Sequence, residues 1–209
     1  MFDWVRKFVF IHVPKTAGST ISHALLTSLV GRTTSGAFAS LPTNVQSAYG
    51  LTANLKHATA PQLKEHLENQ WEEFYKFAFI RDPFDRTISA YHWVRTKSRE
   101  FSRITFNQYV DIIQQYYDDT NHPLSVMIKP QCSFFTDKNR NIMVDDLYSY
   151  EQLDIAIKNI GTRLGLELIP KSHKVTTDRK ATDMYYTSAT RSIITDRYAQ
   201  DFEVWEHIR

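Results

Sequence analysis

A short apolar run that passes directly into a loop of small and hydroxyl-bearing residues is the feature that most constrains the fold. The run is Phe-Val-Phe-Ile at residues 8–11, the loop is Pro-Lys-Thr-Ala-Gly-Ser-Thr at residues 14–20, and a helical pattern begins near Ile21. A buried strand, such a loop and a helix in succession are typical of an α/β sheet. Backbone N–H groups at a helix N-terminus, with a lysine and three hydroxyls nearby, favour an anion of the phosphate type. The sequence therefore predicts a phosphate-binding loop.

The order of residues in this loop differs from that of the common nucleoside-triphosphate loop, in which a glycine, four residues and a second glycine precede Lys-Ser/Thr. Here Lys15 follows Pro14 and precedes Gly18, with no glycine-rich stretch upstream. The loop is short, and the proline fixes its start. It suits a single 5′-phosphate better than a triphosphate with Mg²⁺. An ordinary strand-to-helix turn with a solvated Lys15 is the alternative for this motif taken alone.

A second apolar run, Phe-Ala-Phe-Ile at residues 77–80, leads into Arg81, an aspartate and a proline. The proline stops the strand, and Ser89 falls about two helical turns further on. An arginine at the carboxyl end of a strand and a serine on the next helix can bind one anion above an open sheet. Two phosphate sites at neighbouring strand ends imply a ligand with two separate phosphates. Alternatively, Arg81 pairs with Asp82 or Asp85, and Ser89 packs as a small helical residue.

These segments resemble the sulfotransferases that use 3′-phosphoadenosine-5′-phosphosulfate (PAPS), and within them the branch of heparan-sulfate 2-O-sulfotransferase and its bacterial relatives. Residues 10–20 resemble the family's 5′-phosphosulfate loop. Residues 77–86, with Ser-Ala-Tyr at residues 89–91, resemble its 3′-phosphate motif. Between them, Lys-His-Ala-Thr at residues 56–59 resembles the place where this branch carries its catalytic histidine. Both motifs in this order and at this spacing make a strong resemblance.

The resemblance implies a P-loop-like, three-layer α/β fold with a central parallel sheet flanked by helices, in a single sulfotransferase domain over residues 1–209. It implies transfer of a sulfonyl group from PAPS to an acceptor hydroxyl by in-line displacement, with adenosine 3′,5′-bisphosphate as product and no metal. A carbohydrate is the favoured acceptor, and an anionic saccharide is one candidate. A P-loop-type kinase or NTPase and a non-catalytic nucleotide-binding module are the alternatives.

The resemblance also assigns roles to individual residues. Lys15 is expected to stabilise the departing phosphate, and His57 to act as the base, since an imidazole with a pKa of about 6.5 suits that task. His12, at the end of the first strand, is expected to be a packed residue and is a lesser candidate for the base. The expected nucleotide contacts are Lys15, Thr16, Ala17, Gly18, Ser19 and Thr20 for the 5′-phosphate, Arg81 and Ser89 for the 3′-phosphate, and Arg179 and Lys180 in a late basic loop.

Composition agrees with a compact enzyme, because 209 residues with 42% hydrophobic and 23% charged content suffice for one α/β core. A single cysteine, Cys132, excludes an internal disulfide and a cysteine zinc cluster, and the histidines lack metal-ligand spacing. Nothing resembles a signal peptide or a membrane span, which favours a cytoplasmic protein or a chain trimmed of an anchor. A net charge of +2 does not by itself indicate a polyanionic partner, and no nucleic-acid partner is expected.

Capping residues and apolar periodicity predict the remaining elements. Trp71 and Trp93 are candidates to flank adenine or the acceptor, with core packing as the alternative. The basic cluster of residues 95–103 either attracts an anionic acceptor or forms a solvated face. Helices are expected over residues 19–29, 61–69, 106–117, 151–164 and 188–206, an edge strand over residues 145–148, and a long loop over residues 31–54 that serves as a lid or substrate wall.

Overall fold

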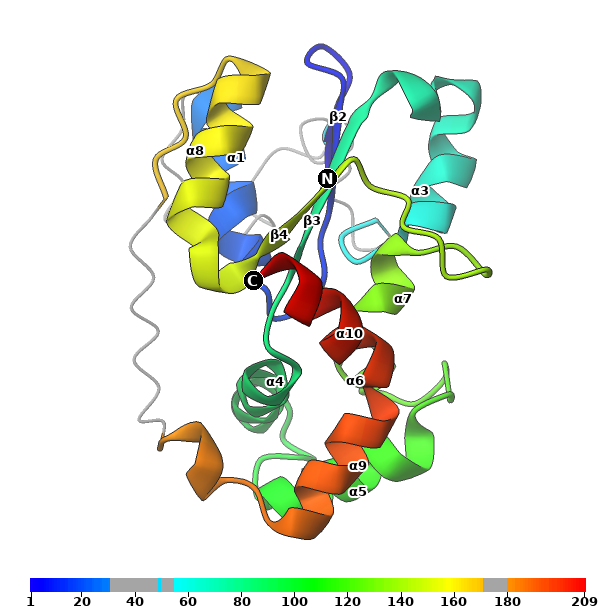
Figure 1. Ribbon diagram of the computed structural model, residues 1–209, viewed down its shortest axis with the longest axis vertical. Coiled ribbons are helices and arrows are strands. Elements are labelled where there is room, and N and C mark those ends of the chain that lie inside the picture. Colours follow the sequence, from blue (N-terminus) through cyan, green and yellow to red (C-terminus); the bar gives the residue numbers. More distant parts are fainter. Residues whose placement is uncertain (31–48, 50–54, 171–179) are drawn as a thin grey trace.

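The computed structural model of the chain describes residues 1–30, 49, 55–170 and 180–209, and a four-stranded sheet lies at its centre (Figure 1). The strands are β1 (Phe2–Asp3), β2 (Phe8–Ile11), β3 (Tyr75–Ile80) and β4 (Asp146–Ser149), in that order across the sheet. The last three are parallel, which confirms the predicted central sheet, whereas β1 is antiparallel to β2. A turn of four residues joins these two strands, and so short a connection permits only antiparallel pairing.

The sheet is covered by helices on both faces, because alternate side chains of each strand point to opposite sides. Val9 and Ile11 of β2 face one side, and Phe8 and Phe10 face the other. The first face packs against α3 (Ala60–Leu67), α7 (Cys132–Phe135) and α10 (Ala199–Ile208), and the second against α1 (Gly18–Val30) and α8 (Leu153–Leu164) (Figure 1). The result is the expected arrangement of three layers.

A separate helical cluster lies at the end of the sheet where β3 leads into α4 (Figure 1). It consists of α4 (Pro83–Lys97), α5 (Phe106–Tyr116), α6 (Ser125–Ile128) and α9 (Ser188–Arg197). Ile88 and Val94 of α4 and Tyr109 of α5 are fully buried at its centre. The carboxyl ends of β2 and β3 therefore lie between the layered sheet and this cluster.

Most helix boundaries follow the predicted capping signals. Thr59 and Thr105 each cap a helix through a capping box, so that α3 and α5 begin where the sequence indicates. The expected helix over residues 151–164 begins with a 3₁₀ turn, η3 (Tyr150–Gln152), and ends at Gly165 in the left-handed region. Two further 3₁₀ turns are η2 (Glu68–Glu73) and η4 (Thr182–Met184).

The prediction of one continuous helix over residues 188–206 is wrong. The helix breaks at Tyr198, whose φ of −114° and ψ of 29° separate α9 from α10. The Tyr198 hydroxyl donates a hydrogen bond to the Ile128 carbonyl at 2.7 Å. This contact with α6 fixes the break, and the two helices follow different directions (Figure 1). The long loop predicted over residues 31–54 lies outside the described residues apart from Tyr49.

Candidate active site

The predicted phosphate-binding loop joins β2 to α1 and is built from an unusual backbone conformation. Lys15 and Ala17 have φ values of 71° and 66°, in the left-handed region that residues other than glycine seldom adopt. The Ala17 carbonyl accepts hydrogen bonds from Thr20 and Ile21, which starts α1. Within the described residues, the backbone N–H groups of residues 16–19 donate no hydrogen bond. Strained loops whose N–H groups are left without an acceptor in this way form anion-binding sites.

Gly18 is required by a neighbouring side chain. A Cβ atom at this position would lie 1.9 Å from both Cδ2 and Nε2 of His12. The space beside Gly18 is filled by the His12 ring. That ring is only 7% exposed and stacks on Phe10, with ring centroids 5.7 Å apart. His12 is therefore the packed residue that the sequence favoured.

His57 lies just ahead of α3, beside His12, with the two ring centroids 4.6 Å apart. Its Nδ1 is 3.1 Å from the backbone carbonyl oxygen of His12. Because a carbonyl oxygen only accepts, Nδ1 carries the proton in the neutral ring and Nε2 keeps its lone pair. Burial lowers the pKa of His57 below 6.5, the Lys56 charge acts in the same direction, and the hydrogen bond to His12 opposes them. His57 is thus suited to accept a proton at neutral pH.

The Lys15 side chain extends toward α4. Its Nζ lies 6.0 Å from the centre of the Trp93 ring, which is 38% exposed and stands one helical turn after Ser89. Ser89 itself is 3% exposed. Trp71, in contrast, is 3% exposed within the sheet core, so core packing applies to Trp71 and not to Trp93.

Arg81 connects the two predicted phosphate motifs. Its Nε donates to Asp85 at 2.6 Å, its Nη2 is also paired with Asp85, and its Nη1 donates to the Lys15 carbonyl at 3.1 Å. The guanidinium stacks on the Tyr150 ring at 4.0 Å from its centre. The alternative pairing with Asp85 is therefore present, and the arginine holds the phosphate-binding loop at the same time.

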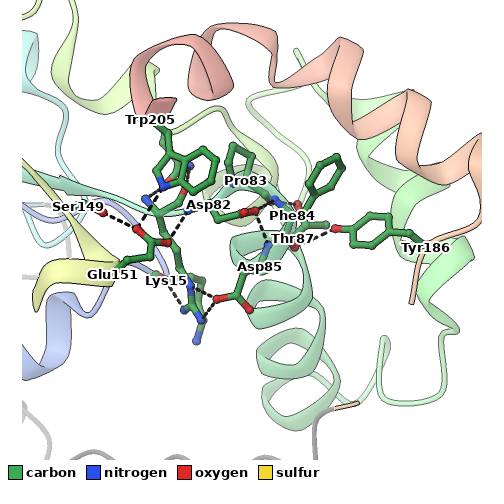
Figure 2. Close-up of polar contacts among 12 residues, drawn as sticks. Lys15, Asp82, Pro83, Phe84, Asp85, Thr87, Ser149, Glu151, Tyr186 and Trp205 are labelled. Carbon is green, nitrogen blue, oxygen red and sulfur yellow. Dashed lines mark hydrogen bonds and ion pairs between the residues drawn. The ribbon is translucent and has the colours of Figure 1, made fainter. Parts of the chain in front are cut away.

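A carboxylate that the sequence did not single out, Glu151, supports the start of α4. It accepts hydrogen bonds from the Asp82 backbone N–H at 3.0 Å, the Ser149 hydroxyl at 2.5 Å and Trp205 Nε1 at 3.2 Å (Figure 2). Burial raises the pKa of Glu151, but these hydrogen bonds outweigh it and the pKa is lowered. The carboxylate stays charged and ties β4 and α10 to the second motif.

Gln131 is a second supporting residue without a sequence signal. Its side-chain amide donates to the Arg81 carbonyl at 2.8 Å and accepts from the Arg81 N–H at 3.0 Å. Asp82 caps α4 by accepting from the N–H groups of Phe84 and Asp85 (Figure 2). Together these contacts fix the backbone where β3 becomes α4, and hence the place of the Arg81 side chain.

The late basic loop is described only in part. Arg179 lies outside the described residues. Lys180 is exposed, and its backbone N–H donates to the Tyr185 hydroxyl at 3.4 Å. The same hydroxyl is 2.7 Å from Nε2 of His92 on α4. Lys180 is thereby placed beside the helix that carries Ser89, and its contact with a nucleotide stays a prediction.

The described part of the chain offers neither a metal-binding cluster nor a membrane-spanning helix. No group of three or more His, Cys, Asp or Glu side chains there could hold a metal ion. Among the same residues, no helix has the length and apolar character to cross a bilayer.

Comparison with known proteins identifies a protein family. A model of the sulfotransferase family matches residues 1–207. No curated protein and no solved structure matches the chain. The match covers nearly the whole sequence, and it includes the loop and helix start described above. This chain belongs to the sulfotransferase family.

Proposed function

We propose that this protein transfers the sulfonyl group of PAPS to a hydroxyl of a carbohydrate, with His57 as base and Lys15 stabilising the leaving phosphate. Membership of the family gives sulfonyl transfer in general. The observation that carries the finer proposal is the loop over residues 14–19, in which four consecutive backbone N–H groups have no acceptor among the described residues. Such a loop fits a phosphate without a metal, because the protein itself supplies the donors.

PAPS, when bound, supplies the sulfonyl group and a 3′,5′-bisphosphate leaving group. The loop N–H groups and the hydroxyls of Ser19 and Thr20 then bind the 5′-phosphate, and Lys15 Nζ stabilises the charge that develops on it. Thr16 contributes its backbone N–H, because its hydroxyl donates to the Val13 carbonyl at 3.0 Å. Arg81 and Ser89 bind the 3′-phosphate. The described contacts of Arg81 use three of its five N–H donors, which leaves two for that phosphate. His57 Nε2 takes the proton of the acceptor hydroxyl, since Nδ1 is engaged by His12.

Trp93 supports the carbohydrate proposal on the acceptor side. Its ring is exposed, stands near Lys15 Nζ and lies on α4 beyond Ser89. An exposed aromatic face beside the reactive lysine suits the apolar face of a sugar ring. Exposed basic residues follow at the end of α4, where Arg95 is held by the Tyr91 hydroxyl and the Ser102 carbonyl. This arrangement favours a saccharide with anionic substituents.

Thermal unfolding with adenosine 3′,5′-bisphosphate, ADP and ATP–Mg²⁺ tests the nucleotide site. At a hundred times its Kd, a ligand adds about 2.7 kcal/mol, which for a chain of this size raises Tm by roughly 5–10 °C. We expect that shift with the bisphosphate and its loss in Arg81→Ala. A shift with ATP–Mg²⁺ and none with the bisphosphate would overturn the proposal in favour of a kinase or NTPase.

Sulfonyl transfer from PAPS to a panel of saccharides tests the base. His57→Gln is expected to lower kcat by about 10²–10⁴-fold, the usual contribution of a general base, and to leave the Kd of the bisphosphate unchanged. His66→Gln is the matched control, because His66 is an exposed histidine on α3, the helix that follows His57. An unaltered kcat in His57→Gln removes His57 as the base.

A further inference from the structure

Among the described residues, Arg86 is the largest whose side chain is fully buried, and neither the motif roles nor the proposed chemistry uses it. It stands in the first turns of α4 and is 1% exposed. Its Nε donates to the Pro14 carbonyl at 3.3 Å, and its guanidinium lies 5.7 Å from the centre of the Tyr198 ring. Among the described residues, Nη2 has no hydrogen-bond partner.

Burial of this cation is costly, because a charge removed from water needs compensation. Part of the compensation comes from Asp201, a fully buried carboxylate on α10. Asp201 accepts hydrogen bonds from the backbone N–H groups of Gln131 and Cys132 at 2.7 and 2.8 Å. Burial raises the pKa of Asp201, and the Arg86 charge acts against that rise. The Asp201 charge offsets part of the cost of burying Arg86, but it does not explain why an arginine is needed at this position.

The phosphate-binding loop supplies that reason. The carbonyls of Pro14 and Lys15 belong to the two peptide groups on either side of the Lys15 Cα atom. Arg86 holds the first carbonyl and Arg81 holds the second. Fixing both peptide groups fixes the rotation between them, which is the left-handed conformation of Lys15. It also keeps two carbonyl oxygens directed at arginines, and a carbonyl oxygen directed at a phosphate would repel it.

We propose that Arg86 is a positioning residue for the phosphate-binding loop, and that its Nε–H bond to Pro14 keeps the loop N–H groups and Lys15 directed at the 5′-phosphate. Arg86 does not touch the nucleotide. It acts from the far side of the loop, through the backbone. The inference rests on the proposed function in one respect, namely that the anion held by the loop is the 5′-phosphate of a nucleotide.

Arg86→Lys isolates this contact. Lysine has a methylene group where arginine has Nε, so the positive charge stays near Asp201 while the donor to Pro14 is lost. The readout is the ratio of the affinities for adenosine 3′,5′-bisphosphate and adenosine 3′-monophosphate, measured by calorimetry. That ratio reports the contribution of the 5′-phosphate alone. We expect it to fall about tenfold in Arg86→Lys, the size of one charge-assisted hydrogen bond, with the 3′-monophosphate affinity nearly unchanged.

Val94→Ala is the matched control for a purely structural effect, since Val94 is fully buried on the same helix and packs away from the loop. It is expected to lower Tm by roughly 5 °C and to leave the ratio as in the wild type. A structural role of Arg86 alone would give Arg86→Lys the same result, a lower Tm with an unchanged ratio, and would overturn the inference.

The affinities of the wild type distinguish failure of the inference about Arg86 from failure of the proposed function. Equal affinity of the wild type for the two nucleotides, or binding of neither, contradicts a 5′-phosphate site altogether. If the wild type binds the bisphosphate more tightly than the 3′-monophosphate and Arg86→Lys has the same affinity ratio, only the proposed role of Arg86 is excluded.

Should Arg86→Lys yield no folded protein, Arg86→Met is measured in the same way. This variant removes the donor together with the charge, and Asp201 can then take up a proton. A tenfold fall in the ratio supports the inference in either variant, and an unchanged ratio contradicts it.

Discussion

At the scale of single residues, Gly18 and the His12 ring are fitted to one another. The ring is held between Phe10 and His57 and has little room to withdraw. We therefore expect Gly18→Ala to lower the free energy of unfolding by about 1–3 kcal/mol, the usual cost of overpacking, and to weaken binding of the bisphosphate. Urea denaturation and calorimetry measure the two effects.

A double-mutant cycle identifies the cause. In a His12→Ser background the obstructing ring is absent, so Gly18→Ala is expected to cost well under half of its effect in the wild type. Additive effects of the two substitutions would show that the strain at Gly18 has another origin.

The histidine pair makes stability depend on pH. Burial lowers the pKa of His12 well below 6.5, with the charges of His57 and Lys15 acting in the same direction, and the pKa of His57 is lowered too. As the pH falls below 6.5, the unfolded chain binds protons at these two residues before the folded protein does. The free energy of unfolding is therefore expected to decrease between pH 7.5 and 5.5. Urea denaturation at both pH values should show a smaller decrease in His12→Phe, and an equal decrease would exclude His12 as a source.

At the scale of elements, two glycines of α8 and its C-terminal end are required for different reasons: Gly161 lies in the helix, and Gly165 ends it. Gly165 has a φ of 63° and nothing within 4 Å of an added Cβ, so the only reason for a glycine there is its left-handed backbone conformation. A Cβ at Gly161 would lie 2.7 Å from the Leu166 carbonyl oxygen. Gly165→Ala is expected to cost about 1 kcal/mol, Gly165→Asn less, and Gly161→Ala more than either. Urea denaturation gives the order, and a larger cost for Gly165→Ala than for Gly161→Ala would contradict it.

The elements that could be predicted are those whose signals are local. Thr59, Thr105 and Gly165 act on their own helices, and β2 and β3 are continuous apolar runs. The break at Tyr198 could not be predicted, because the apolar face continues across it and its cause is a contact with Ile128, 70 residues away in sequence. The reversal of β1 was missed because its turn lacks glycine and proline and instead uses a left-handed lysine.

The same distinction between local sequence signals and tertiary contacts applies to the candidate site. Lys15 and Arg81 lie in sequence motifs, so the sequence alone identifies them as candidate site residues. Two residues that hold the second motif in place, Gln131 and Glu151, lie outside both motifs. Gln131 meets Arg81 across 50 positions of sequence, and Glu151 meets Asp82 across 69. Their roles follow from tertiary packing, which no local pattern encodes.

At the scale of the whole molecule, the layered sheet and the helical cluster share contacts. Phe202 packs against both, and Asp201 beside it joins α10 to the start of α7. We therefore expect one cooperative unfolding transition, in agreement with the single domain predicted over residues 1–209. Far-UV circular dichroism and tryptophan fluorescence, followed in the same urea series, should give equal midpoints. Two separated midpoints would divide the sheet from the cluster and contradict that prediction.

The contacts of α10 with the middle of the chain have a consequence for biosynthesis. Trp205 and Asp201 complete the hydrogen bonding of Glu151 and of the Gln131 turn, and both of those groups hold the second phosphate motif. A ribosome makes the phosphate-binding loop and the motif that follows it long before it makes α10. The nascent chain therefore carries both halves of the proposed nucleotide site without their support until the residues through Trp205 have left the exit tunnel, and only then is nucleotide binding expected to add to the stability of the new protein.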